Sequence, residues 1–187
     1  MRKSCPHPRF LASFALISAV VLLVPASALG ARACESANAT PAKAAHRIVV
    51  RATLCMLNSV RSRHGLGPLE LNRRLSRAAR RHARDMARRK YFSHDTLGGG
   101  SFVDRIRHTG YLHGAHRWAV GENLAWATHG QSAPRGVTEL WMKSPGHRAN
   151  ILNGTFREIG IGIVGRAPVR GVTQPAATYA TDFGAKS

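Results

Sequence analysis

The sequence contains 187 residues, with 28 lysines and arginines against nine aspartates and glutamates, which gives a formal net charge of +19. This length accommodates one domain and a targeting segment, and it is too short for two domains of ordinary size. No recognition module that combines basic and aromatic residues is present, so we expect no nucleic-acid partner.

The first 31 residues have the pattern of a secretory signal peptide. A basic start is followed by an apolar run over residues 10–29, and small residues at 26–28 and 31–33 offer cleavage sites. An uncleaved membrane anchor is the alternative, because about 20 apolar residues can span a bilayer. Pro25 and the small residues after it favour cleavage, so we predict a secreted, extracellular protein. Cleavage removes three of the 28 basic residues and none of the nine acids, which leaves a net charge of +16.

Residues 32–46 form a polar lead-in, and a single domain is expected over residues 47–187. Helical spacing of apolar residues predicts a first helix over residues 44–65. Cys5 leaves with the signal peptide, so Cys34 and Cys55 remain, and in an exported protein two cysteines indicate one disulfide. Two free buried thiols are the alternative.

A second helix is predicted over residues 73–92, capped by Asn72, and basic side chains line its outer face. The simplest interpretation of this arginine run is a solvated face. So strongly cationic a secreted protein also suits anionic envelope polymers or a membrane surface as partners. The bias toward arginine can equally come from genome composition alone, and both interpretations stay open.

The rest of the chain predicts short helices followed by strands. A short helix begins at Ser101, where Asp104 nearly completes a capping box. The sequence then predicts an extended segment over 120–127, helices over 136–144 and 144–153, and strands over 158–165 and 177–184. Helices first and antiparallel strands late favour an α+β fold. The G-x-G-x-x-G match at 160–165 is no nucleotide loop, because no helix can follow it; its glycines indicate close packing against the strand.

Three short stretches contain residues with useful chemistry, namely His94 in YFSHDT, Glu122 in GENLAW and His147 in SPGHRANIL. Ser144 and Pro145 place His147 in the first turn of a helix, where unpaired N–H groups and the helix dipole disfavour a protonated imidazole. Two histidines and a carboxylate suffice for a Zn²⁺ site with an open position. Their spacing does not show that they meet, and His147 can instead be a partly buried helix residue.

Another histidine, His82, lies on the apolar side of the second helix. A buried imidazole with a hydrogen-bond partner is common in protein cores. We therefore expect His82 to be a core residue with no part in a site.

Several motifs together resemble one known family. HARDMARRKYFSH, GENLAW, LWMKSPGHRANIL and EIGIGIV occur in the order typical of the bacterial SCP-like domains of the CAP superfamily. These domains are related to cysteine-rich secretory proteins, antigen 5 and plant pathogenesis-related class 1 proteins. The resemblance covers about residues 50–185. It implies a three-layer α-β-α sandwich with a central antiparallel sheet, and a cleft lined by two histidines and two acidic residues.

The resemblance assigns three of those four positions to residues of this sequence. By motif, His94 and His147 are the two histidines and Glu122 is the glutamate of the GEN motif. The family's second glutamate follows the helix tryptophan by three residues, which is Ser144 here. Glu139 precedes Trp141 and would project from a different part of that helix.

Three functions follow as expectations. The first is a monomeric binding module at the cell envelope, whose His/Glu-lined cleft takes a lipid or other small apolar or anionic ligand, or a metal. No cofactor is required in this hypothesis, and zinc is the candidate ion at His94, Glu122 and His147. The second is a hydrolase in which a metal or Glu122 activates water. The third, based on charge alone, is a cationic antimicrobial or toxic protein.

Overall fold

The computed structural model describes residues 34–187, so the signal peptide and the alternative membrane anchor lie outside the described residues. Within residues 34–187, no helix is both long enough and apolar enough to cross a membrane. The helices are α2 (His46–Arg63), α3 (Arg73–Arg89), α4 (Phe102–His108), α5 (Pro134–Lys143) and α6 (Pro145–Ile151), with a 3-10 turn at His129–Ser132. The strands are β1 (Glu70–Leu71), β2 (Trp118–Thr128), β3 (Glu158–Val164) and β4 (Ala176–Lys186).

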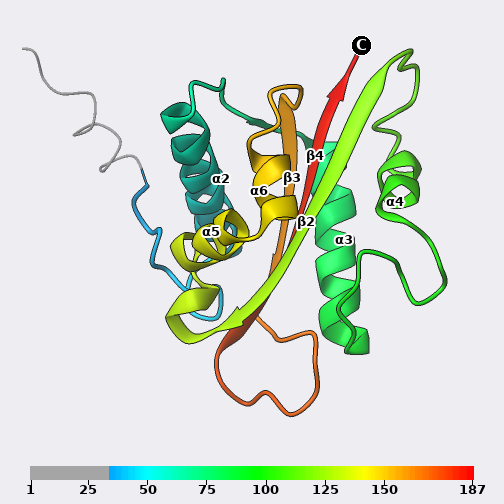
Figure 1. The fold of residues 1–187 in the computed structure, drawn as a ribbon. Helices are drawn as coiled ribbons and strands as arrows, with labels where there is room; N and C mark the ends of the chain where they lie inside the picture. Colours follow the sequence, from blue (N-terminus) through cyan, green and yellow to red (C-terminus); the bar gives the residue numbers. More distant parts are fainter. Residues whose placement is uncertain (1–33) are drawn as a thin grey trace, which may run out of the picture.

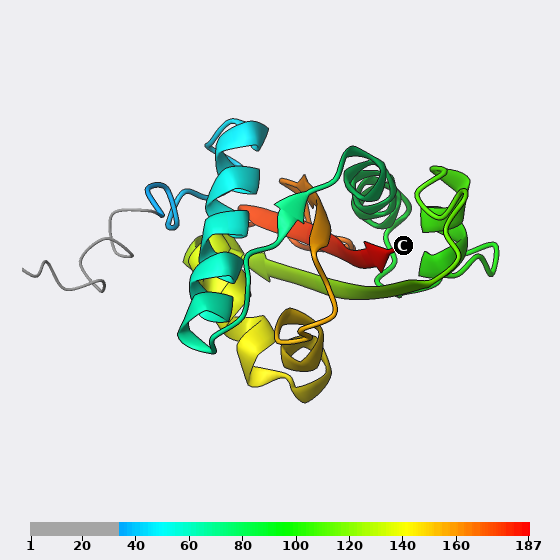
Figure 2. The same ribbon diagram turned by 90° about the horizontal axis from the view of Figure 1, so that it is seen from above.

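The four strands form one sheet in the order β1-β3-β4-β2, covered by helices on both faces. Helices α3 and α4 lie on one face, and α2, α5 and α6 lie on the other (Figures 1 and 2). The expected α+β sandwich is confirmed. Strands β2, β4 and β3 pair antiparallel, whereas β1 pairs parallel with β3 and makes the sheet mixed. The sequence did not predict β1, because two residues are too few to show strand alternation.

Side-chain caps fix where two of the helices begin. The side chain of Asn72 accepts hydrogen bonds from the backbone of Arg74 and Leu75 at the start of α3. Ser101 and Asp104 form a complete capping box at α4. Both caps were predicted. Ser144 occupies the cap position of α6 without a side-chain hydrogen bond, and Pro145 follows as the first helical residue.

The glycines of β3 allow α3 to lie directly on the sheet. A Cβ atom on Gly160 would lie 2.0 Å from the carbonyl carbon of Leu75, and one on Gly162 would lie 2.3 Å from that of Ala79. The close packing expected from the alternating glycines is therefore present, and it identifies the face of the sheet that α3 covers.

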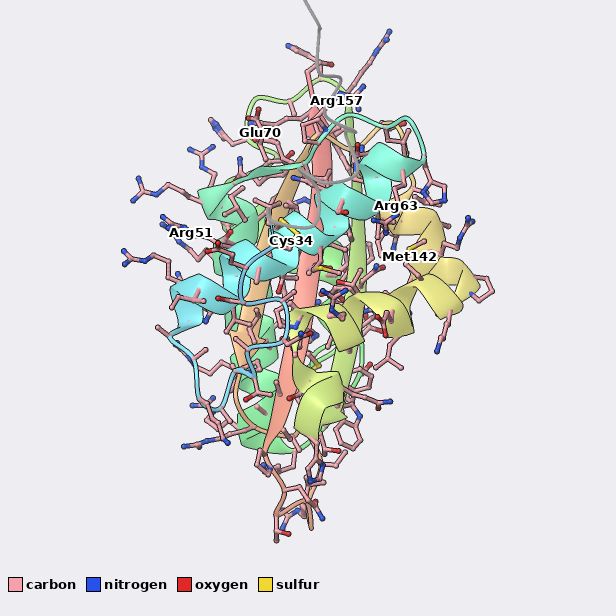
Figure 3. All side chains as sticks on the ribbon, turned by 90° about the vertical axis from the view of Figure 1, so that its left-hand side faces the viewer. Cys34, Arg51, Arg63, Glu70, Met142 and Arg157 are labelled. Atoms are coloured by element: carbon pink, nitrogen blue, oxygen red, sulfur yellow. A yellow bond between two sulfur atoms is a disulfide. The ribbon has the colours of Figure 1, made fainter. Side chains whose placement is uncertain are left out.

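The opposite face of the sheet carries the larger part of the core. Ile159, Ile161 and Ile163 of β3 pack there with residues of α2 and α5, including the fully buried Trp141. A disulfide joins Cys34 to Cys55 and holds the start of the described chain to α2 (Figure 3). The predicted pairing of these two cysteines is therefore found.

Candidate functional site

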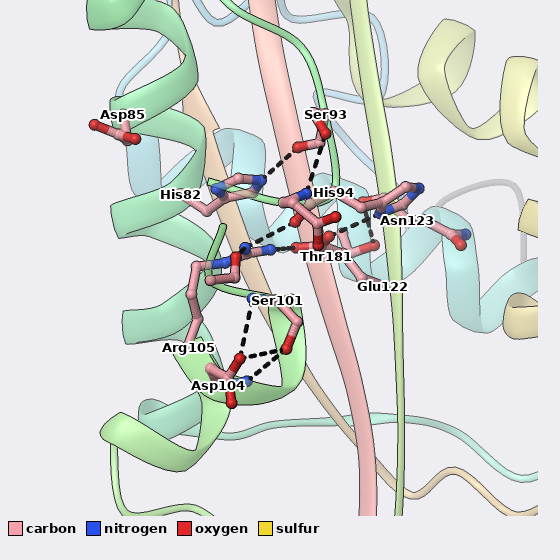
Figure 4. A network of polar contacts seen from close by, with 12 residues as sticks. His82, Asp85, Ser93, His94, Ser101, Asp104, Arg105, Glu122, Asn123 and Thr181 are labelled. Carbon is pink, nitrogen blue, oxygen red and sulfur yellow. Dashed lines mark hydrogen bonds and ion pairs between the residues drawn. The ribbon is translucent and has the colours of Figure 1, made fainter. Parts of the chain in front are cut away.

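His94, Glu122 and Arg105 form a connected group on the α3 side of the sheet (Figure 4). His94 follows α3 in a loop, Glu122 lies on β2, and Arg105 lies on α4. The Nδ1 atom of His94 is 2.8 Å from Oε1 of Glu122. Since a carboxylate only accepts hydrogen bonds, Nδ1 is the donor, and Nε2 of His94 has no part in this contact.

Arg105 holds both partners of this pair. Its Nη2 donates to Oε2 of Glu122 at 2.6 Å, and its Nη1 donates to the backbone carbonyl of His94 at 2.8 Å. The side chain of Glu122 is 1% exposed and that of His94 is 53% exposed. Glu122 is therefore an enclosed support, while the His94 ring faces solvent.

The residue after Glu122 connects the sheet to α6 on the other face. Asn123 Nδ2 donates to the backbone carbonyl of His147 at 3.0 Å. Asn150 in turn donates to the carbonyl of Glu122 at 3.1 Å and to the Asn123 side chain at 2.9 Å. Successive strand residues face opposite sides of a sheet. The GEN motif therefore directs Glu122 toward His94 on one face and Asn123 toward the backbone of His147 on the other.

The two histidines differ in their protonation. The hydrogen bond to Glu122 raises the pKa of His94 above its ordinary value. Burial lowers the pKa of His147, and the charge of His94 lowers it further. Strand β2 is at the edge of the sheet, which lets a side chain from α6 approach one from the α3 face. The lowered pKa favours the neutral form of the His147 imidazole at neutral pH.

One family model matches more than half of the chain. The model of the cysteine-rich secretory protein family, CAP, matches residues 54–175. The chain belongs to the CAP family. Two similar Bacillus subtilis proteins are YkwD, 38% identical over 109 residues, and the membrane protein YlbC, 33% identical over 113 residues. These alignments cover 58% and 59% of this chain but only 40% and 30% of the relatives, so the chain spans less than half of either protein.

Solved structures have a similar fold. An extracellular protein containing an SCP domain from Bacillus anthracis is 26% identical, with a TM-score of 0.55 over 75% of this chain and 43% of that one. An outer surface protein of Borrelia burgdorferi is 19% identical, with a TM-score of 0.63 over 77% of this chain and 97% of that one, and it supports the fold alone.

The second acidic group at the site of this CAP domain is Asp182, which the sequence analysis missed. Asp182 lies directly opposite Glu122 in the β2–β4 pairing, and it is 1% exposed. Burial raises its pKa well above the ordinary range, and the neighbouring charge of Glu122 raises it further. Neither carboxyl oxygen accepts a hydrogen bond from a donor within residues 34–187. The sequence signal that could have identified Asp182 is a carboxylate among the small and apolar residues of β4.

The structure brings His94 and Glu122 into contact, and it links the His147 backbone to Asn123, the residue after Glu122. Glu122 is not placed as a metal ligand, because both of its carboxylate oxygens already accept hydrogen bonds from His94 and Arg105. Within residues 34–187, no three His, Cys, Asp or Glu side chains are grouped so that they could hold a metal ion. Zinc binding stays a prediction. Glu139 is exposed on α5, which agrees with its expected separation from the site.

His82 is a core histidine, as expected, and it lies beside the site. It is 1% exposed, and its Nε2 donates to the carbonyl of Ser93 at 2.9 Å. Burial lowers its pKa, with a further contribution from the charge of Arg105. His82 thus fixes the backbone next to His94 while remaining neutral.

Proposed function

We propose that this CAP domain is an extracellular, non-enzymatic binding module that holds the anionic head of a small amphiphile at His94. The observation that carries the proposal is the 2.8 Å contact between His94 and the enclosed Glu122, on a ring that is half exposed to solvent. This contact favours protonated His94, and a protonated ring presents its Nε2–H as a donor to an anion.

The charges around His94 support an anionic ligand. Glu122 carries the carboxylate that both Arg105 and His94 contact, whereas the high pKa of Asp182 keeps its carboxyl group neutral. Two cationic groups then face one carboxylate, which leaves an excess of positive charge. An anion is therefore attracted to the exposed ring of His94.

Apolar side chains near His94 in the sequence support a ligand with an apolar tail. Phe92 and Leu97 belong to the same loop as His94, and they are 41% and 56% exposed. Large apolar side chains exposed beside a polar anchor are typical of ligand sites. A fatty acid combines the required carboxylate and chain.

Palmitate binding tests this proposal. We expect the wild-type protein to bind palmitate, His94→Ala to lose at least about tenfold in affinity, which corresponds to about 1.4 kcal/mol, and His113→Ala to bind normally. His113 is an exposed histidine that serves as the matched control. Binding should weaken as the pH rises through the raised pKa of His94. Equal affinity in the wild type and His94→Ala would refute the proposal.

Zinc is the other ligand that the titration should include. The imidazoles of His94 and His147 suit Zn²⁺, and a carboxylate behind a ligating histidine is a common supporting arrangement. Bound zinc would supply Lewis acidity. Calorimetric binding near one equivalent that both His94→Ala and His147→Ala abolish, with no palmitate binding, would favour the metal hypothesis over ours.

A hydrolase is the second candidate, and the paired carboxylate and imidazole favour it. Such a pair orients a general base. Because Glu122 is enclosed, the base would be Nε2 of His94 rather than Glu122 itself. Hydrolysis of a fluorescent casein that His94→Ala abolishes would support this function. An antimicrobial action stays a prediction from charge alone.

A further inference from the structure

Helix α3 presents a dense row of arginines that the site does not use. Its 17 residues include a single acidic residue, Asp85. All of its arginines are exposed, at positions Arg73, Arg74, Arg77, Arg80, Arg81, Arg84, Arg88 and Arg89. The helix therefore concentrates positive charge on its outer surface.

These arginines form a stripe along the helix. Positions 73, 77, 80, 84 and 88 recur every three or four residues, which aligns them on one side of a helix. At a rise of about 1.5 Å per residue, the stripe extends about 22 Å. Leu75, Ala79 and Met86 are buried on the opposite side, against the sheet. The packing of α3 fixes the stripe facing outward.

Most of this charge has no counter-charge within residues 34–187. Asp85 lies 3.7 Å from Arg88 and 3.8 Å from Arg89. The other arginines of α3 form no ion pair in the part of the chain that the structure describes. Like charges one helical turn apart repel each other, so a bound polyanion would relieve repulsion along the whole stripe.

The start of α2 also carries exposed positive charge. Burial lowers the pKa of His46, and the charges of Arg80 and Arg84 lower it further. Arg47 and Arg51 follow on α2 and are exposed. Figure 3 shows Arg51 directed outward at one edge of the molecule, whereas Arg63 lies toward the other.

We propose that the outer face of α3 binds a linear, oxyanion-bearing polymer, such as a phosphate-containing chain of the cell envelope. A row of guanidinium groups one helical turn apart can contact successive anions of such a chain. The α3 stripe contains no aromatic side chain, so it offers no platform on which nucleic-acid bases could stack.

A polymer fits this face better than a bilayer does. Helices that lie on membranes insert exposed apolar side chains between the lipids. None of the six large apolar residues exposed within residues 34–187 belongs to α3, whose own apolar side is packed on the sheet. The face can therefore supply electrostatic contacts without insertion.

The test compares two variants with equal changes in net charge. One is Arg77→Glu/Arg80→Glu/Arg84→Glu on the stripe, and the control is Arg63→Glu/Arg117→Glu/Lys143→Glu, exposed residues away from it. Fluorescence anisotropy measures binding of labelled long-chain polyphosphate at about 0.15 M salt, where the screening length is about 8 Å. Vesicles of phosphatidylglycerol are tested in parallel.

We expect wild-type binding that weakens steeply with salt, a loss of at least about tenfold in the stripe variant, and a much smaller loss in the control. Circular dichroism establishes that both variants are folded. Equal losses in the two variants would mean that only net charge matters, and would overturn the proposal. Absence of polyphosphate binding would also overturn it, and vesicle binding alone would assign the face to membranes.

Discussion

Glu122 and Asp182 face each other across β2 and β4, with both carboxyl groups on the side of the sheet that α3 covers. Gly160 establishes this side, because it pairs with Asp182 and its Cβ would point into the backbone of Leu75. Arg105 and His94 contact Glu122, so the ionised member of the pair is Glu122 and the protonated one is Asp182.

Replacing Asp182 with asparagine should stabilise the protein at neutral pH. Above pH 3.8, the ordinary pKa of an aspartate, the unfolded chain loses the Asp182 proton while the folded protein still keeps it. The stability that this proton contributes is fully present below pH 3.8 and is lost as the pH rises toward the raised pKa of the folded state. Asparagine does not titrate, so the effect of Asp182→Asn on the free energy of unfolding should be more favourable at pH 7 than at pH 4. Urea unfolding of both proteins at the two pH values measures this. A difference that does not vary with pH would contradict a protonated Asp182.

Replacing Glu122 with glutamine should lower the pKa of His94. The hydrogen bond from His94 to Glu122 is the largest cause of the raised pKa, and glutamine carries no charge to stabilise the imidazolium. NMR titration of the His94 ring gives the pKa directly. Asp182→Asn is the control, because it removes a carboxyl group that is already neutral and should leave His94 almost unchanged.

Removal of the disulfide should lower stability without changing the site. Cys34 and Cys55 are 21 residues apart, and closing a loop of this size is worth about 3 kcal/mol in the chain-entropy model. Cys34→Ser and the reduced wild type should lose the same free energy of unfolding. Retention of full stability after reduction would show that the bond contributes nothing to folding.

The contact between α3 and the sheet should not tolerate a methyl group. Gly160→Ala places a Cβ atom 2.0 Å from the backbone of Leu75, so α3 must move away from the sheet. We expect a loss of about 3 kcal/mol or more in thermal or urea unfolding. Gly98→Ala is the matched control, because a Cβ atom there meets nothing within 4 Å. Similar stabilities of the two variants would contradict the close packing.

Local patterns in the sequence predicted most elements of the fold. The caps at Asn72 and Ser101, the paired cysteines and the β3 glycines all follow from short stretches of residues. The parallel strand β1 could not be predicted in this way, because Glu70 and Leu71 become a strand only when β3 lies beside them.

The site was harder to predict, because its contacts join distant residues. Family motifs supplied His94, Glu122 and His147. Arg105 lies 17 positions before Glu122 and Asp182 lies 60 positions after it, and only the position of α4 and the register of β2 with β4 bring them to it. No spacing in the sequence indicates that register.

The most direct test of the account is the state of the His94 ring, measured with and without palmitate by long-range proton–nitrogen NMR at about pH 6, below the ordinary pKa of 6.5 that Glu122 raises. We predict that both ring nitrogens are protonated, that the Nδ1 signal shows the hydrogen bond to Glu122, and that palmitate shifts the Nε2 signal. A neutral His94 ring, or palmitate binding that leaves both His94 signals unchanged, would contradict the account.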